Sequence, residues 1–150
     1  MSRFARRLQQ STAVSTSVIK LYLTPSQGAH IVGDTVVVTI REDSLTTPVN
    51  SVGVDLTYPA GMLQYQSSST TGSGFTTTIQ NTGGSGAVNI AVGILAGSVT
   101  GDQLVGTVTF LVIGTGQADV TFDPTSGIAR AAPPNDDVCQ AKLNASYTIS

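Results

Sequence analysis

The segment SVGVDLTY (residues 51–58) carries the pattern that decides the fold class. In it Val52, Val54, Leu56 and Tyr58 alternate with a glycine, an aspartate and a threonine. Successive side chains of an extended strand point to opposite faces, so an apolar period of two indicates a strand with one buried face. We therefore predict a β-strand here, buried on one side.

The same alternation recurs on both sides of this segment. Further strands are predicted at residues 17–24, 35–41, 63–67, 75–80, 88–95, 104–113, 118–122 and 145–149. Turn clusters such as Gly83-Gly84-Ser85-Gly86 separate them, which is typical of sandwiches and barrels. The prediction is an all-β sandwich of about nine antiparallel strands. Its predicted core contains Leu21, Val38, Val54, Leu56, Val108, Phe110 and Val120.

The length of 150 residues fits one domain. We assign residues 17–150 to this domain, because the period of two starts there. Residues 1–16 show no clear period and are predicted to form an N-terminal arm. A frayed tail is the alternative interpretation of this segment.

Charge is scarce and unevenly distributed. Charged residues make up 11% of the chain, against roughly 25% in an ordinary soluble domain. Arg3, Arg6 and Arg7 are three of the seven basic residues, so residues 8–150 carry a net charge of −5, from four basic and nine acidic groups. A negative domain argues against nucleic-acid binding. A polar, uncharged surface favours a protein of a virion surface, a cell surface or the extracellular space.

No segment approaches the roughly 20 apolar residues that a membrane-spanning helix needs, so we predict no membrane insertion. The first residues have the basic opening of a signal peptide but no apolar run after it. We therefore expect either that the protein is not exported by that route or that a leader has been removed.

Several segments, taken in order, resemble those of cohesin domains and of related carbohydrate-binding-module-like sandwiches. The resemblance starts at LYLTPS (residues 21–26) and VGDTVVV (residues 32–38). It continues through VGVDLTYPAGML (residues 52–63), GDQLVGTVTF (residues 101–110) and GQADVTF (residues 116–122). It implies a nine-stranded, jelly-roll-type sandwich, with a turn at Gly33-Asp34 and a tight corner at Gly116. It also implies docking receptors, adhesive modules or sugar binders as the functional classes.

Catalytic residues are sparse. His30 is the single histidine and Cys139 the single cysteine, so no intramolecular disulfide can form. We interpret His30 as a solvated loop residue, because a serine or cysteine nucleophile would need it paired and oriented. Cys139 is interpreted as an inert small residue, with intermolecular pairing as the alternative. We predict no catalytic site, although a pair of glycosidase carboxylates stays open.

No metal or cofactor is predicted. One histidine and one cysteine cannot hold zinc without carboxylates, and no spacing matches an EF-hand loop. Asn135-Asp136-Asp137 is the densest acidic group and could close a calcium loop, but solvated turn residues are the favoured interpretation. Asp55 and Asp119 are interpreted as surface residues.

A sugar-binding platform has little support, because the chain has no tryptophan. Tyr58, Phe110 and Phe122 fall on core phases, whereas Tyr22, Tyr65 and Tyr147 could be exposed. The tripeptide Asn144-Ala145-Ser146 satisfies the N-glycosylation pattern, to which we attach no function.

The sequence therefore predicts a non-catalytic structural or interaction protein. It would dock on or decorate a larger assembly, as a virus-particle accessory subunit or a cell-surface module. The alternative is a carbohydrate-binding or adhesion module, and an enzyme comes third. The partner-binding residues are predicted in the arm: Arg3, Arg6 and Arg7 would bond to an acidic partner, and Phe4 and Leu8 would provide apolar anchors.

Overall fold

The computed structural model describes residues 17–150, which contain twelve strands and no helix. None of the described residues belongs to a helix that could cross a membrane. The strands are β1 (Lys20–Thr24), β2 (Gln27–His30), β3 (Thr35–Asp43), β4 (Val49–Thr57), β5 (Leu63–Ser69), β6 (Thr77–Gly84), β7 (Ala87–Gly93), β8 (Asp102–Val112), β9 (Gly116–Phe122), β10 (Gly127–Arg130), β11 (Ala141–Leu143) and β12 (Ala145–Ile149).

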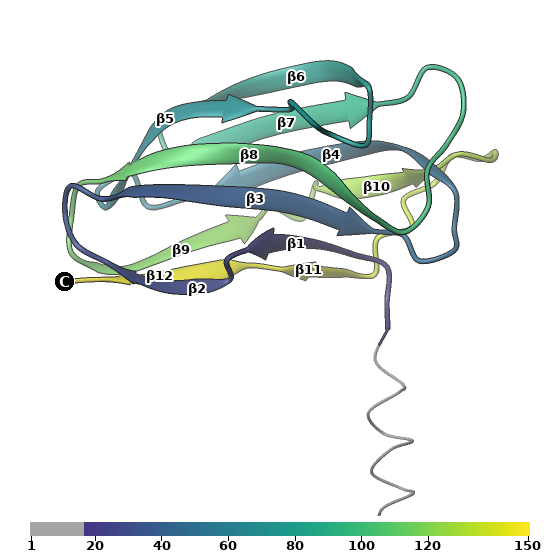
Figure 1. Cartoon of the computed structure of the whole chain (residues 1–150). Helices are drawn as coiled ribbons and strands as arrows, with labels where there is room; N and C mark the ends of the chain where they lie inside the picture. The colour runs from purple at the N-terminus through teal and green to yellow at the C-terminus, as the bar shows by residue number, and fades with distance from the viewer. Residues whose placement is uncertain (1–16) are drawn as a thin grey trace, which may run out of the picture.

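Two sheets pack face to face as a sandwich (Figure 1). One has the order β11-β1-β3-β8-β5, and the other has the order β2-β12-β9-β4-β7-β6, with β10 added to β4. The prediction of an all-β sandwich is confirmed. Two details are wrong: β2, β10 and β11 were not predicted, and the pairs β1–β11 and β2–β12 are parallel rather than antiparallel.

The core lies between the two sheets, and the predicted period of two holds. In β4, Val52, Val54 and Leu56 point inward, each 1% exposed. All seven predicted core residues are buried. Burial of a large apolar side chain contributes about 1.5–3 kcal/mol relative to exposure, so this layer supplies most of the drive to fold.

Both ends of the described chain change sheets. The chain leaves β1 at Pro25 and continues as β2 in the opposite sheet, and β11 and β12 make the same change at Asn144. Two hydrogen bonds fix these crossings: the Tyr147 hydroxyl donates to the Pro25 carbonyl at 2.6 Å, and the Phe122 amide donates to the Asn144 side chain at 2.9 Å. The terminal segments therefore tie the two sheets together.

The predicted turn at Gly33-Asp34 is present between β2 and β3. Gly33 has φ +100°, a conformation that favours glycine. The Asp34 amide donates to the Ile31 carbonyl at 3.1 Å, and the Ile31 amide donates to the Asp34 carboxylate at 3.1 Å. Gly116, at the predicted tight corner, has φ +125°. The β2–β3 turn presents Ile31 and Val32 to solvent.

Candidate interaction surfaces

His30 is the last residue of β2, so the prediction of a loop at this position is wrong. Its ring packs edge-on against Tyr147, with centroids 5.7 Å apart, and its Nδ1 lies 3.5 Å from an Asp34 carboxylate oxygen. Among the described residues it makes no hydrogen bond to a serine, threonine or cysteine. The side-chain contacts that the structure shows for His30 are therefore with an aromatic ring and a carboxylate.

Cys139 lies in the segment before β11, half-buried. Burial raises the pKa of its thiol, which disfavours the thiolate, and the Sγ atom lies 3.2 Å from the Ala141 carbonyl. The neighbouring Asp137 carboxylate accepts hydrogen bonds from the Ile128 and Cys139 amides at 3.0 and 2.9 Å. The Asp136 carboxylate lies 3.1 Å from the Arg130 guanidinium. These acids hold the loop, and residues 17–150 contain no metal-holding group of three His, Cys, Asp or Glu.

The three tyrosines predicted to be available for sugar stacking do not form a platform. Tyr147 is fully buried in the core, because it shares the inward phase of β12 with Ala145 and Ile149, so its predicted exposure is wrong. Tyr22 and Tyr65 are partly buried and lie on β1 and β5, with β3 and β8 between them. Tyr22 donates to Asp102, and Tyr65 bonds to Ser68 at 2.6 Å.

The predicted partner-binding residues Arg3, Phe4, Arg6, Arg7 and Leu8 lie outside the described residues. Their role therefore stays a prediction.

One outer surface of the sandwich consists of small residues. We call it the β4–β7 face, and it comprises Ser51, Gly53, Asp55, Thr57, Ala87, Asn89, Ala91 and Gly93, together with Ile79 of β6. Ile79 is 67% exposed and extends over Gly93, where an added Cβ would lie 3.4 Å from the Ile79 Cδ1 atom. The side chains of this face are therefore short, except for Ile79, which projects above them.

The β4–β7 face is also nearly free of charge. Asp55 is the only charged residue among residues 44–101. Its carboxylate is occupied: one oxygen accepts from the Asn89 side chain at 2.7 Å and the other from the Thr125 hydroxyl at 2.6 Å. Depletion of charge is typical of the centres of protein interfaces.

A second candidate surface, which consists of apolar residues, lies at the β2–β3 turn. We call it the turn patch: Ile31, Val32, Val37 and Ile113, which are between 42% and 60% exposed. Two hydrogen bonds of 2.9 Å bring its parts together, from the Gly33 amide to the Val112 carbonyl and from the Val112 amide to the Asp34 carbonyl.

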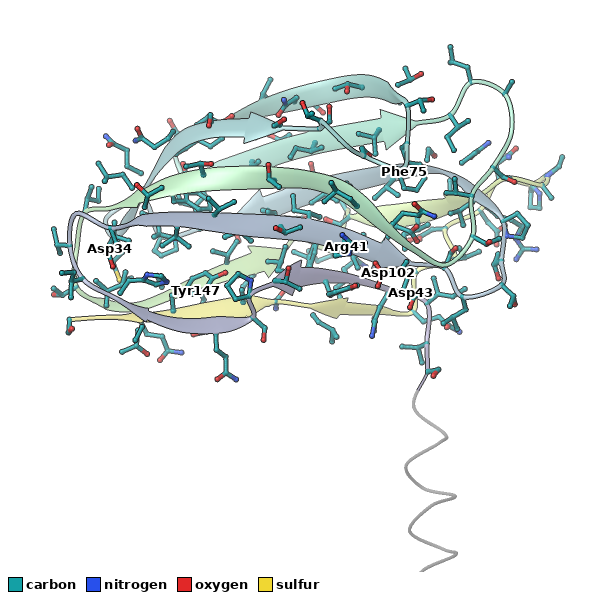
Figure 2. The ribbon with its side chains drawn as sticks, in the orientation of Figure 1. Asp34, Arg41, Asp43, Phe75, Asp102 and Tyr147 are labelled. Carbon is teal, nitrogen blue, oxygen red and sulfur yellow. The ribbon has the colours of Figure 1, made fainter. Side chains whose placement is uncertain are left out.

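Charge gathers at the opposite end of β3, where Arg41, Asp43 and Asp102 lie close together in Figure 2, far from Asp34. We call Lys20, Tyr22, Arg41, Glu42, Asp43 and Asp102 the charged corner. The Arg41 Nε atom donates to the Asp102 carboxylate at 2.7 Å, and Lys20 Nζ lies 5.2 Å from the Tyr22 ring centroid.

Glu42 differs from the other members of this corner because it points into the core. Its side chain is fully buried, and neither carboxyl oxygen has a hydrogen-bond partner among residues 17–150. Burial, assisted by the negative charges of Asp43 and Asp102, raises the pKa of Glu42 from 4.5 to about 8. The group is therefore mostly protonated at neutral pH.

Sequence reasoning missed both candidate surfaces and Glu42, although signals were present. Val37 lies out of phase with the inward Val36 and Val38, which predicts an outward side chain. Glu42 follows Ile40 by two residues, so the same alternation predicts that its side chain points inward. For Ile79, which sits at a β-bulge between Thr78 and Gln80, the alternation gives no such signal.

Comparison with known proteins identifies the fold of this chain from structure, but it identifies no family from sequence. No protein-family model matches the chain, and no curated protein matches it. Solved structures do resemble it. A type I cohesin, the seventh of ScaB from Pseudobacteroides cellulosolvens, has a TM-score of 0.72 at 17% identity, covering 89% of this chain and 92% of its own.

Two further structures resemble the chain to the same degree. A non-cellulosomal cohesin from Archaeoglobus fulgidus has a TM-score of 0.71 at 15% identity, with 89% and 92% of the two chains covered. A type I cohesin–dockerin complex from Clostridium thermocellum has a TM-score of 0.71 at 10% identity, with 89% and 94% covered. Residues 17–150 therefore form a cohesin-like β-sandwich, as the sequence resemblance implied.

Proposed function

We propose that this chain is a non-catalytic interaction module that binds a folded protein partner through the β4–β7 face. The observation that carries the proposal is a broad, neutral sheet face with one raised isoleucine, Ile79. The fold supports it, because one of the similar structures is a cohesin captured with a dockerin.

The chemistry of the face suits a protein surface. Ser51, Gly53, Ala91 and Gly93 let a partner approach closely, and Ile79 supplies an apolar anchor. Asp55 is the one charge on the face, and the two hydrogen bonds that its carboxylate accepts would offset part of the cost of desolvating it on binding. Among residues 17–150 no aromatic strip supports the sugar-binding alternative.

Two single variants test the face. Ile79→Asp introduces a charge at the apolar side chain of the face, whereas the control Leu143→Asp introduces the same charge at an exposed apolar residue of β11. The partner is first captured from cell extract with the wild type and with Leu143→Asp, and is then purified. In calorimetry, Ile79→Asp should bind this partner at least tenfold more weakly than the wild type does. Equal affinity for Ile79→Asp would place the interface elsewhere.

We further propose that the arm, residues 1–16, attaches the protein to a larger assembly on a virion or a cell surface. Fixing the backbone of a segment on a partner costs about 1–2 kcal/mol of entropy per residue, which contacts of Arg6, Arg7, Phe4 and Leu8 would have to offset. Deleting residues 2–16 should abolish attachment while leaving the melting temperature nearly unchanged. A truncated protein that still attaches would disprove this role.

A further inference from the structure

We propose that two loops at one end of the sandwich form a lid over Glu42, and that this lid opens when Glu42 loses its proton. The loops are residues 44–48, between β3 and β4, and residues 94–101, between β7 and β8 (Figure 1). Together we call them the loop lid. The protonation state of one buried side chain then sets the conformation of this end of the molecule.

Glu42 is enclosed on the sides where strands run. It is the second-to-last residue of β3, and its neighbours in register are Leu21 of β1 and Gln103 of β8. The shortest route from its carboxyl group to solvent therefore runs past the end of β3, where the loop lid lies. Ser44, two residues further on, is also fully buried, and its hydroxyl has no hydrogen-bond partner among residues 17–150.

Neither Glu42 oxygen has a partner among the described residues, so nothing inside the closed end compensates a negative charge. An uncharged carboxyl group in such surroundings is costly, and a carboxylate is far more costly. The closed end therefore accepts Glu42 as the neutral acid. A Glu42 carboxylate needs water, and the least disruptive way to reach water is to move the loops.

The two loops of the lid are bonded to each other and to the start of β4. The Ser44 amide donates to the Gly101 carbonyl at 3.2 Å, and the Gly101 amide donates to the Leu45 carbonyl at 2.9 Å. Val49 and Val99 exchange two backbone hydrogen bonds of 2.9 Å. Since both loops share these bonds, they open together rather than singly.

Opening the lid gives up little packing. Residues 95–98 are exposed, and Ile94 and Val99 are only partly buried against the core. Leu45 has φ 55°, a left-handed conformation that is unfavourable for a residue with a side chain, so opening also relieves strain. Segments with few buried contacts are the ones that open while the rest of a domain stays folded.

The loop lid contains no ionisable residue. The ionisable residues on the elements around Glu42 are Lys20 and Tyr22 of β1, Arg41 and Asp43 of β3, Asp102 of β8, Arg130 of β10, and Asp136, Asp137 and Cys139 between β10 and β11. Asp43 and Asp102 oppose ionisation of Glu42, and Arg41 favours it. Among the described residues, Glu42 has the one carboxyl group that is fully buried, so the response is assigned to it.

The test measures the access of a reagent to the underside of the lid. In full-length chains with Cys139→Ser, one preparation carries Val99→Cys and another carries Leu95→Cys, which lies in the same loop at a residue that is 90% exposed. The ratio of their thiol-labelling rates cancels the effect of pH on thiolate formation. Opening linked to loss of one proton grows by up to about tenfold per pH unit above the pKa of Glu42, about 8. The ratio should therefore rise at least about tenfold between pH 7 and pH 9.5.

Three controls accompany this measurement. Glu42→Gln in the Val99→Cys chain should keep the ratio low at every pH, whereas Asp119→Asn, which removes a carboxylate of β9, should leave the rise unchanged. A chain with Val92→Cys, at a fully buried residue of β7, should stay protected at pH 9.5.

Nuclear magnetic resonance of the wild-type protein gives a measurement without an added cysteine. The side-chain carboxyl carbon of Glu42 should titrate at the pH at which the labelling ratio rises. The backbone amides of Ser44, Val99 and Gly101 should change at the same midpoint, because their hydrogen bonds hold the lid.

Three results would overturn the inference. A constant labelling ratio while the Glu42 carboxyl group ionises would show that the proton leaves with the lid closed. A rise that persists in Glu42→Gln would assign the opening to another group. A parallel rise at Val92→Cys would show that the whole sandwich unfolds and that no separate lid exists.

Discussion

The charged corner and the β4–β7 face belong to the same sandwich but are stabilised in different ways. The corner gathers six polar or ionisable side chains on β1, β3 and β8, including the buried Glu42. The face draws on residues 44–101, where Asp55 is the only charge. From this difference we expect stability at the charged corner to depend on pH and salt, and stability around the β4–β7 face to depend on them little.

The largest expected effect concerns Glu42. Below pH 4.5 the folded and the unfolded chain both hold its proton. Between pH 4.5 and about 8 the unfolded chain releases the proton while the folded chain keeps it. The free energy of unfolding therefore falls with pH across this window, by about 1.4 kcal/mol per unit and on the order of 5 kcal/mol in total.

Glu42→Gln should remove this decline, since the amide carries no titrating proton. The measurement is urea unfolding of both proteins at pH 4 and pH 9. The variant and the wild type should be similar at pH 4, and the variant should be clearly more stable at pH 9. Identical pH profiles for the two proteins would show that Glu42 ionises freely.

The second prediction concerns Phe75, which is 2% exposed and belongs to the nearly uncharged segment. Phe75→Ala should lower the free energy of unfolding by about 3–4 kcal/mol through loss of burial and creation of a cavity. The loss should be the same at pH 5 and pH 9, and at low and high salt. A loss that varies with pH would break the distinction between the two regions.

The smallest effect is expected at the surface of the corner. Arg41→Ala removes the pairing of Arg41 with Asp102, whose side chain is 41% exposed. Exposed pairs are worth about 0.2–1 kcal/mol and are screened by salt. The variant should lose less than about 1 kcal/mol at low salt and less still at 1 M salt. The control is Thr39→Ala, because Thr39 lies two residues before Arg41 and on the same side of β3. Its effect on the free energy of unfolding should not depend on salt.

The elements that could be predicted from the sequence are those with a local pattern. The alternation in β3, β4 and β8 predicted which side chains are buried, because strand geometry alone decides it. The missed strands β2, β10 and β11 have three or four residues, too few for a period to appear. They exist because partners distant in sequence pair with them.

The surfaces were harder to predict for a related reason. The exposure of Ile79 depends on a bulge against β7, which is not a property of neighbouring residues. Tyr147 instead shares the inward phase of Ala145 and Ile149, so the alternation of β12 did carry a signal for its burial. The outward phase of Val37 was readable, but the exposure of Ile31, Val32 and Ile113 depends on the turn between β2 and β3, which bonds to Val112.

The parallel pairing of β2 with β12 has a consequence for biosynthesis. Among the described strands β2 has no other neighbour in its sheet, and its partner residues, Ser146 to Ile149, are synthesised more than 100 residues after it. Until they emerge, the backbone groups of β2 have no native partner, although β1 can already pair with β3. Contacts of such long sequence separation form slowly. The sandwich therefore cannot close before residues 145–149 have left the ribosome, and a nascent chain stalled before residue 145 would expose the unfinished sheet edge to cellular chaperones.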